Sequence, residues 1–380
     1  MTPFSIAAPG RILFGRGEAA RAADLIAGFG VRGFVVHGAQ ARRAGWLLAG
    51  LRAQGIAVDT FACRSEPDLV TLEAAVTAAR VCGAGFVVGF GGGAAMDLAK
   101  AVAALVPAPG GAMDHLEIVG RGLPLRADPL PFIAIPTTAG TGAEVTKNAV
   151  IGLPAHDRKV SLRDDRMLAR LAIVDPALTD HCPRAVTLAS GLDALAQVIE
   201  PFLSTRVTPF TDALTRPAIS LGLGALIRLM EDEEDAEARD QIAWVSLCGG
   251  LALANGGLGA VHGLAGPIGG MTGAAHGAIC GVLLAPVLQA NAAKATGLAA
   301  DRIAEVRAMV ARALRAAPGT AFYALARWIS DAGLPPLSAQ GLAPEARPLA
   351  AEAALRSSSM AGNPVALGVA DLVAAMAAAG

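Results

Sequence analysis

Short apolar runs alternate with stretches of helical periodicity along the first half of the chain. Four of these runs predict β-strands, at residues 33–38, 56–62, 85–90 and 131–138. Residues 69–83, between the second and third runs, carry apolar side chains at helical spacing. Strands that alternate with helices indicate βαβ units, and strands without polar alternation indicate a parallel sheet covered on both faces. The pattern therefore predicts an α/β domain built on a parallel sheet.

Helical periodicity dominates the second half, where strand signals largely disappear. Pro176 and Pro183 mark the change. Ala- and Leu-rich patterns predict helices at 185–202, 210–230, 237–254, 276–293, 301–314, 319–332, 345–357 and 365–379. We therefore expect an α/β domain over residues 1–180 and an all-helical domain over residues 181–380.

Composition and charge exclude several classes of protein. The chain has 31 Lys and Arg against 32 Asp and Glu, a net charge of −1, and this balance gives no field that would attract nucleic acid or an anionic membrane. Apolar residues make up 54%, too many for a disordered chain. The five cysteines are scattered, odd in number and form no CxxC pair, which favours reduced thiols and a cytoplasmic location.

One segment could be mistaken for a membrane region, because no charged residue lies between Gln241 and Ala293. Histidines, asparagines, prolines and many glycines interrupt it, so it contains no continuous apolar span of about 20 residues. We expect buried helices and turns around a site here. The N-terminus also lacks a basic region ahead of an apolar one, so we expect no targeting segment.

Two loops have the composition of ligand-binding loops. Gly91-Gly92-Gly93 follows a predicted strand and opens a helix, where free backbone N–H groups and the helix dipole favour a phosphate. A tight strand-to-helix turn would use the same glycines. Residues 136–146 place hydroxyls and small residues after the fourth strand, which suits a loop at the carboxyl end of a parallel sheet. A threonine-rich turn with local hydrogen bonds explains that loop equally well.

The helical half contains candidate metal ligands. Asp193 and Gln197 are four residues apart and share a helix face, and His262 and His276 lie in the charge-free segment. Two imidazoles and one carboxylate form the ligand set of open Fe(II) sites, and they also suit Zn(II). The alternative is a pair of hydrogen-bonded core histidines.

Several motifs, in order along most of the chain, resemble those of the iron-containing alcohol dehydrogenases. The matching segments are GGGAAMDLAK, IPTTAGTGAEVT, AIVDPALT, SGLDALAQVIEPFLS and VHGLAGPIGGMTGAAHGAICGVLLAPVLQAN. This family shares its fold with dehydroquinate synthase. The resemblance implies a Rossmann-like domain that binds NAD or NADP, an all-α domain that binds a divalent metal (Fe or Zn), a small alcohol, aldehyde or ketone as substrate, and a homodimer or larger homo-oligomer.

The resemblance also implies roles for individual residues. The cofactor would contact Gly38, Gly92, Gly93, Ala94, Asp97, Thr137, Thr138, Thr141 and Lys159, with Leu178 near the nicotinamide. The metal would be held by Asp193, Gln197, His262 and His276. In a version without metal, His262 or His276 would be the catalytic residue that donates a proton to the substrate oxygen.

The chain departs from the family's pattern at four places. Gln197 replaces a histidine ligand, and a neutral amide oxygen is a poor ligand for Fe(II) or Zn(II). Gly266 replaces a histidine that relays the alcohol proton, and Ala94 replaces a serine that contacts the phosphates. Gly38 stands where many NAD-specific members have an aspartate, so Arg42 or Arg43 could pair with the 2′-phosphate of NADP.

These features predict hydride transfer between NAD(P) and a small alcohol or carbonyl compound, with a divalent metal polarising the substrate oxygen. One alternative is a metal-independent enzyme similar to the maleylacetate reductases. Another is a dinucleotide-binding relative without catalytic activity, which the two lost histidines would suggest.

Overall fold

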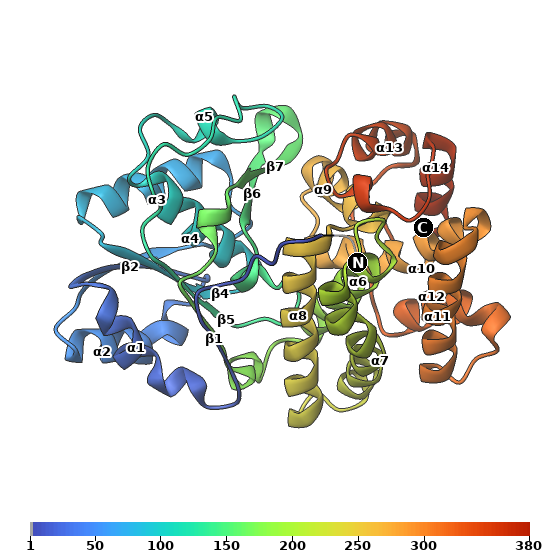
Figure 1. The fold of residues 1–380 in the computed structure, drawn as a ribbon, viewed down its shortest axis with the longest axis horizontal. Helices are drawn as coiled ribbons and strands as arrows, with labels where there is room; N and C mark the ends of the chain where they lie inside the picture. Colours follow the sequence, from blue (N-terminus) through green and yellow to red (C-terminus); the bar gives the residue numbers. More distant parts are fainter. Residues whose placement is uncertain (1–2) are drawn as a thin grey trace. The chain divides into compact units, whose positions relative to one another are not determined.

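The computed structural model describes residues 3–380, and contacts along this part of the chain form two compact units. The α/β unit holds residues 7–138 and 142–179, and the helical unit holds residues 3–6, 139–141 and 180–380. Figure 1 shows strands in the first unit and helices throughout the second. The predicted fold class, a parallel-sheet domain followed by a helical domain, is confirmed.

Six parallel strands form the main sheet of the α/β unit. They are β1 (Ile12–Phe14), β2 (Arg32–His37), β3 (Ala57–Ala62), β4 (Phe86–Gly91), β5 (Phe132–Pro136) and β8 (Leu171–Val174), in the order β1-β8-β5-β4-β2-β3. The four predicted strands are β2, β3, β4 and β5. The chain leaves β2 for β3 on one side and then crosses to β4 on the other. This reversal places the topological switch point, where such sheets bind ligands, between β2 and β4.

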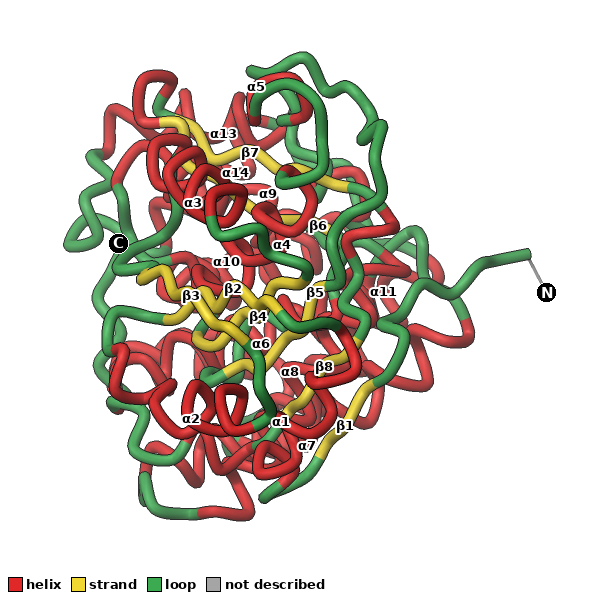
Figure 2. Tube along the Cα trace, turned by 90° about the vertical axis from the view of Figure 1, so that its left-hand side faces the viewer, coloured by secondary structure: helices red, strands yellow, loops and turns green. Residues whose placement is uncertain are grey.

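Helices cover both faces of this sheet, as Figure 2 shows for the strands between α1 and α2 below and α3 and α4 above. Their bounds are α1 (Ala22–Ile26), α2 (Gly45–Ala53), α3 (Leu69–Val81) and α4 (Gly93–Leu105), and the short α5 (Ala112–His115) follows. Alternate strand residues such as Val88 and Ile133 pack with Leu47 of α2 in one buried cluster. On the opposite face, a Cβ at Gly89 would lie 3.0 Å from Met96 Cε, so this glycine lets α4 pack closely on the sheet.

An antiparallel hairpin that the sequence analysis missed completes the α/β unit. Strands β6 (Asn148–Leu153) and β7 (Arg158–Arg163) pair across a turn in which Asp157 has a positive φ of 49°. Burial alternates along β6, as expected for a strand with only one covered face.

The helical unit consists of packed helices that run to the C-terminus. Their bounds are α6 (Arg184–Leu203), α7 (Pro209–Glu231), α8 (Ala236–Gly256), α9 (Ala260–Thr272), α10 (His276–Lys294), α11 (Gly297–Ala313), α12 (Ala321–Asp331), α13 (Arg347–Leu355) and α14 (Val369–Ala378). The sequence analysis predicted all of them except α9, whose glycines and Pro267 disfavour an isolated helix. Helix α6 packs against α7, α8 and α10, so nearly all its side chains after the first two turns are buried.

By length and apolarity alone, three helices within residues 3–380 could cross a membrane: α6, α7 and α10. The bent pair of α8 and α9 would make a fourth. In the most apolar 18-residue stretch of α6, 83% is buried inside the protein. Packing in the protein core therefore accounts for the apolar character of that helix.

Candidate functional site

The carboxyl ends of β2, β4 and β5 meet at a glycine-rich edge of the sheet. A Cβ at Gly91 would lie 3.2 Å from the backbone nitrogen of Gly38, and one at Gly92 would lie 3.2 Å from Thr138 Oγ1. The backbone N–H of Thr137 donates to the carbonyl of Gly91 at 2.8 Å. Glycine is therefore required for these three loops to approach one another.

Helix α4 begins at this edge, with Gly92 as its N-cap. Gly92 has no side chain, so the N-cap residue offers no acceptor to the N–H groups of Gly93 and Ala94 in the first turn. Such a helix N-terminus at a switch point suits the phosphates of a dinucleotide.

Other side chains expected to contact the cofactor bond to protein groups. Asp97 Oδ2 accepts the N–H of Val150 at 3.1 Å and so fixes the hairpin to α4. Lys159 pairs with Glu66. The carbonyl of Leu178 accepts a hydrogen bond from Arg43 at 2.9 Å, so the guanidinium of Arg43 is held on the chain itself.

Arg42 makes only a long contact, 3.5 Å, to Gln40. Thr141 belongs to the helical unit, where its carbonyl accepts the side-chain amide of Gln197 at 2.6 Å.

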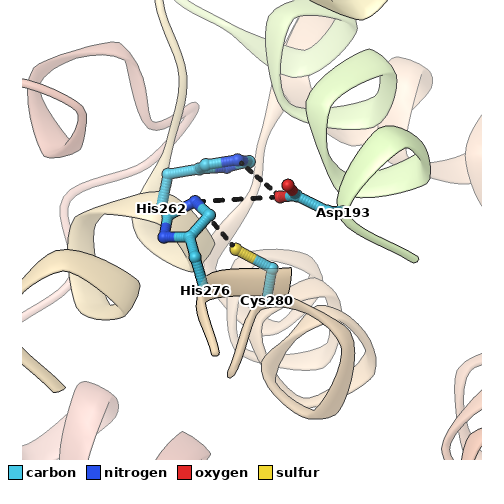
Figure 3. Close-up of side chains that lie close together, drawn as sticks. All are labelled: Asp193, His262, His276 and Cys280. Atoms are coloured by element: carbon cyan, nitrogen blue, oxygen red, sulfur yellow. Dashed lines mark hydrogen bonds and ion pairs between the residues drawn. The ribbon is translucent and has the colours of Figure 1, made fainter. Parts of the chain in front are cut away.

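Asp193, His262 and His276 come together in the helical unit, as Figure 3 shows. Helices α6, α9 and α10 supply one residue each. His262 Nε2 lies 3.3 Å from Asp193 Oδ1, and His276 Nε2 lies 3.8 Å from the same oxygen. Asp193 and His262 are buried, and the His276 side chain is one-third exposed. Three residues that the sequence analysis chose from spacing and resemblance thus converge on one point.

A fourth side chain, Cys280, joins this cluster and was missed by the sequence analysis. Its Sγ lies 3.6 Å from His276 Nε2, one helical turn earlier on α10. One ligand atom from each of Asp193, His262, His276 and Cys280 lies within 4.8 Å of all the others. We name these residues the four-residue cluster. The spacing of four residues between His276 and Cys280 was the available signal.

Glu200 orients His262 and was also missed. Its Oε2 lies 2.6 Å from His262 Nδ1, and its Oε1 accepts the N–H of Val261 at 2.6 Å. A carboxylate only accepts hydrogen bonds, so Nδ1 carries a proton, and whenever the ring is neutral Nε2 has its lone pair toward Asp193. A carboxylate behind a histidine in this way is typical of metal sites. Glu200 also caps the N-terminus of α9 and so positions the helix that carries His262.

Glycines on α10 allow this convergence. A Cβ at Gly277 would lie 2.6 Å from the carbonyl oxygen of Ala189 on α6, and one at Gly281 would lie 2.8 Å from Leu192 Cδ1. Because both positions lack a side chain, α10 packs closely on α6 and brings His276 and Cys280 to Asp193.

Electrostatics in the cluster favour positive charge. Burial acts to lower the pKa of both histidines, yet their interactions with Cys280 and Asp193 outweigh it, together with that of Glu200 on His262. The pKa of His262 is raised well above its usual value and that of His276 to about 9. Burial acts to raise the pKa of Asp193, but the nearby positive charges of His276 and His262 lower it instead. A divalent cation would satisfy the same anionic groups.

The residues present fit such a cation. Asp193 Oδ1 and His262 Nε2 are buried polar atoms without a hydrogen-bond partner, an arrangement that is expensive unless a ligand occupies the space between them. Oxygen and imidazole nitrogen are suitable donors for Fe(II) and Zn(II).

The structure shows the surroundings of Gln197 and Gly266, the two positions where this chain lacks a histidine of the family pattern. The amide nitrogen of Gln197 bonds to the carbonyl of Thr141, and its Cβ and Cγ pack 3.3 Å from the place of a Cβ at Gly249. Around Gly266 on α9, no heavy atom other than its neighbours lies within 4 Å of the place of a Cβ, so the position of the family's relay histidine is open.

Comparisons with known proteins identify the same family in both halves of the chain. A family model described as iron-containing alcohol dehydrogenase matches residues 9–176, and one described as Fe-containing alcohol dehydrogenase family, C-terminal, matches residues 187–380. Long-chain-alcohol dehydrogenase 1 of Geobacillus thermodenitrificans is 39% identical over 239 residues, which are 63% of this chain and 60% of that protein. The 4-hydroxybutyrate dehydrogenase of Cupriavidus necator is 34% identical over 67% of this chain and 68% of that protein. The match with the Geobacillus protein thus spans less than two thirds of its length.

Solved structures match over nearly the whole chain. A 1,3-propanediol oxidoreductase is 26% identical, with a TM-score of 0.89 and full coverage of both chains. A sulfoacetaldehyde reductase from Bifidobacterium kashiwanohense in complex with NAD+ is 27% identical, with a TM-score of 0.84, and the match covers 98% of this chain and 97% of that one.

Proposed function

Because the chain belongs to the iron-containing alcohol dehydrogenase family, we propose that it is an NAD(P)-dependent oxidoreductase that interconverts a small alcohol and its aldehyde or ketone. The observation that carries the proposal is the cluster of Asp193, His262 and His276, in which two buried polar atoms have no hydrogen-bond partner. The glycine-rich edge of the sheet supports the dinucleotide part of it.

Asp193, His262 and His276 would hold the cation in this enzyme. When bound, the nicotinamide would supply hydride exchange with the substrate carbon, and the cation would supply positive charge that stabilises the substrate oxygen. The protein's contribution is to fix these groups in place. Asp193 balances charge, and Glu200 holds a proton on His262 Nδ1. His276 is the most exposed of the three residues that would hold the cation.

The edge of the sheet would bind the cofactor. We propose that the free N–H groups at Gly93 and Ala94 receive the pyrophosphate, with Gly38, Gly92, Thr137 and Thr138 forming the surrounding loops. Gly38 presents no carboxylate to repel a 2′-phosphate, so we expect NADP to be accepted as well as NAD. We also expect a cytoplasmic homodimer or larger homo-oligomer.

A panel of small alcohols and aldehydes, assayed with both cofactors by nicotinamide absorbance, tests the proposal. The expected result is turnover by the wild-type enzyme and a fall in kcat/KM of about 100-fold or more in Asp193→Ala, because the four-residue cluster loses its carboxylate. Cofactor affinity should stay unchanged in that variant. Asp371→Ala is the matched control, since this partly buried carboxylate pairs with Lys294 and lies outside the four-residue cluster.

Two outcomes would replace the proposal with its alternatives. Turnover by metal-free protein that His276→Ala abolishes would indicate a metal-independent reductase in which this histidine donates the proton. Cofactor binding without turnover on any substrate would indicate a relative that binds dinucleotide and does not catalyse.

A further inference from the structure

We propose that Cys280 is a metal ligand of this chain and supplies the fourth protein donor in place of the histidine missing at Gln197. The inference rests on the proposed function, since it concerns the same cation site. It makes the donor set one carboxylate, two imidazoles and one thiolate.

The distances in the four-residue cluster support this set. Two donors at about 2.0–2.1 Å from a tetrahedral ion lie about 3.3 Å apart, and a nitrogen and a sulfur at about 2.3 Å lie about 3.6 Å apart. The observed separations are 3.3 Å between His262 Nε2 and Asp193 Oδ1 and 3.6 Å between His276 Nε2 and Cys280 Sγ. A third separation, between His276 Nε2 and Asp193 Oδ1, is slightly longer at 3.8 Å, and all donor atoms of the cluster lie within 4.8 Å of one another.

The position of Cys280 is unlike that of a cysteine that only fills space. His276 and Cys280 are four residues apart on α10 and face the same way, toward Asp193, as Figure 3 shows. Cys248 on α8 makes the contrast, because burial alone raises the pKa of its thiol to about 12 and it is not part of the cluster. A thiol beside two imidazoles and an unpartnered carboxylate oxygen has the neighbours of a ligand.

Gln197 explains why a new donor is needed. Its amide nitrogen bonds to the carbonyl of Thr141, which gives this side chain a structural bond inside the helical unit. A neutral amide oxygen would add little to the binding of a transition metal. A thiolate adds a negative charge and a strong bond, so the cluster keeps four side-chain donors.

The exchange of imidazole for thiolate changes metal preference. Thiolate is a softer donor than imidazole or carboxylate, and Zn²⁺ accepts it readily in tetrahedral sites. We therefore expect Cys280 to increase the preference of this site for Zn²⁺ over Fe²⁺.

Cobalt substitution tests the assignment directly. Protein freed of metal and loaded with one equivalent of Co²⁺ should show the near-ultraviolet charge-transfer absorption of a thiolate bound to cobalt. Cys248→Ala, which removes a buried thiol outside the cluster, should keep this absorption. Cys280→Ser and Cys280→Ala should lose it. Serine is nearly isosteric with cysteine, so the two variants together separate ligand loss from a packing defect, and thermal unfolding of the metal-free proteins checks their folding.

Competition with a chelator gives the second readout. The affinity for Zn²⁺ should fall about 100-fold or more in both Cys280 variants, beyond the 10–100-fold typical of losing an outer-shell partner. The ratio of Zn²⁺ to Fe²⁺ affinity should fall as well. An absorption that persists without Cys280, its absence in cobalt-loaded wild type, or an unchanged Zn²⁺ affinity would each overturn the inference.

These readouts do not depend on turnover. Charge-transfer absorption in a protein that oxidises no alcohol would contradict the proposed function and leave the ligand assignment standing. Turnover with a bound metal but without this absorption would overturn the assignment of Cys280 as a ligand and leave the proposed function standing.

Discussion

At the scale of single residues, Glu200 is the clearest test of how the site is positioned. Its carboxylate lies 2.6 Å from His262 Nδ1. Glu200→Gln keeps the shape but removes the charge, so the lone pair of His262 becomes less basic. We expect affinity for Zn²⁺ to fall about 10-fold, measured by chelator competition, since this is the lower end of what outer-shell partners contribute. An unchanged affinity would show that Glu200 serves only to cap α9.

Gly38 tests the choice of cofactor. No heavy atom lies within 4 Å of the place of its Cβ, so Gly38→Asp should fit without strain. The new carboxylate would accept the ribose hydroxyls of NAD and repel the 2′-phosphate of NADP. We expect the ratio of kcat/KM for NAD to that for NADP to rise at least 10-fold. A strong NAD preference already in the wild type would contradict our expectation that both cofactors are accepted.

Sequence and resemblance were sufficient to select Asp193, His262 and His276, which the structure brings together. Cys280 and Glu200 were missed. The sequence analysis treated the five cysteines together as scattered, reduced thiols, and Glu200 lies seven residues after Asp193 in a helix where no partner was yet known. Such roles depend on which side chains α9 and α10 bring to α6, and spacing along one helix does not contain that information.

At the scale of helices, some glycines allow close packing and others only weaken the helix, and substitution by alanine distinguishes the two. At Gly281 on α10, a Cβ would lie 2.7 Å from Leu334 and 2.8 Å from Leu192. Gly281→Ala should therefore lower the free energy of unfolding by about 1–3 kcal/mol through overpacking. At Gly224 on α7, a Cβ meets nothing within 4 Å, so Gly224→Ala should raise it by about 0.5–1 kcal/mol through helix propensity.

Chemical denaturation of the two variants measures both effects. Equal stability changes of the same sign would contradict the close packing of α10 against α6. Loss of metal binding in Gly281→Ala with Gly224→Ala unaffected would be the further sign that this packing positions Cys280.

The errors of the sequence analysis at this scale have physical reasons. Buried strands such as β4 and β5 were found because parallel strands covered on both faces are continuously apolar. Helix α9 was missed because glycines and Pro267 weaken its intrinsic preference, while Glu200 and Asn363 cap its N-terminus from elsewhere in the fold. The hairpin of β6 and β7 was missed because its strands are covered on one face only and its turn uses Asp157 at positive φ.

At the scale of the whole molecule, a buried lysine makes stability depend on pH. Lys100 is fully buried and donates to the carbonyls of Ala143 and Asn148 and to the hydroxyl of Thr146. Burial lowers its pKa from 10.5 to about 8, although the charges of Asp97 and Glu144 act in the opposite direction. Below pH 8 the lysine is charged in both the folded and the unfolded state. The cost of burying that charge then lowers the free energy of unfolding by its full amount.

As the pH rises from about 8 to 10.5, the unfolded state retains this proton longer than the folded state. The free energy of unfolding should therefore increase with pH in this window, by up to about 3 kcal/mol from this group. Lys100→Met removes the titration. Denaturation at several pH values should show wild type gaining stability relative to the variant, and a constant difference between them would contradict the buried charge.

The most direct test of the central claim is the metal content of protein purified without chelator, measured by elemental mass spectrometry. The claim is that Asp193, His262, His276 and Cys280 hold a divalent cation that this enzyme uses on its substrate oxygen. We predict about one equivalent of Zn or Fe per chain, retained through dialysis. Absence of metal that persists after anaerobic reconstitution with both ions would contradict it.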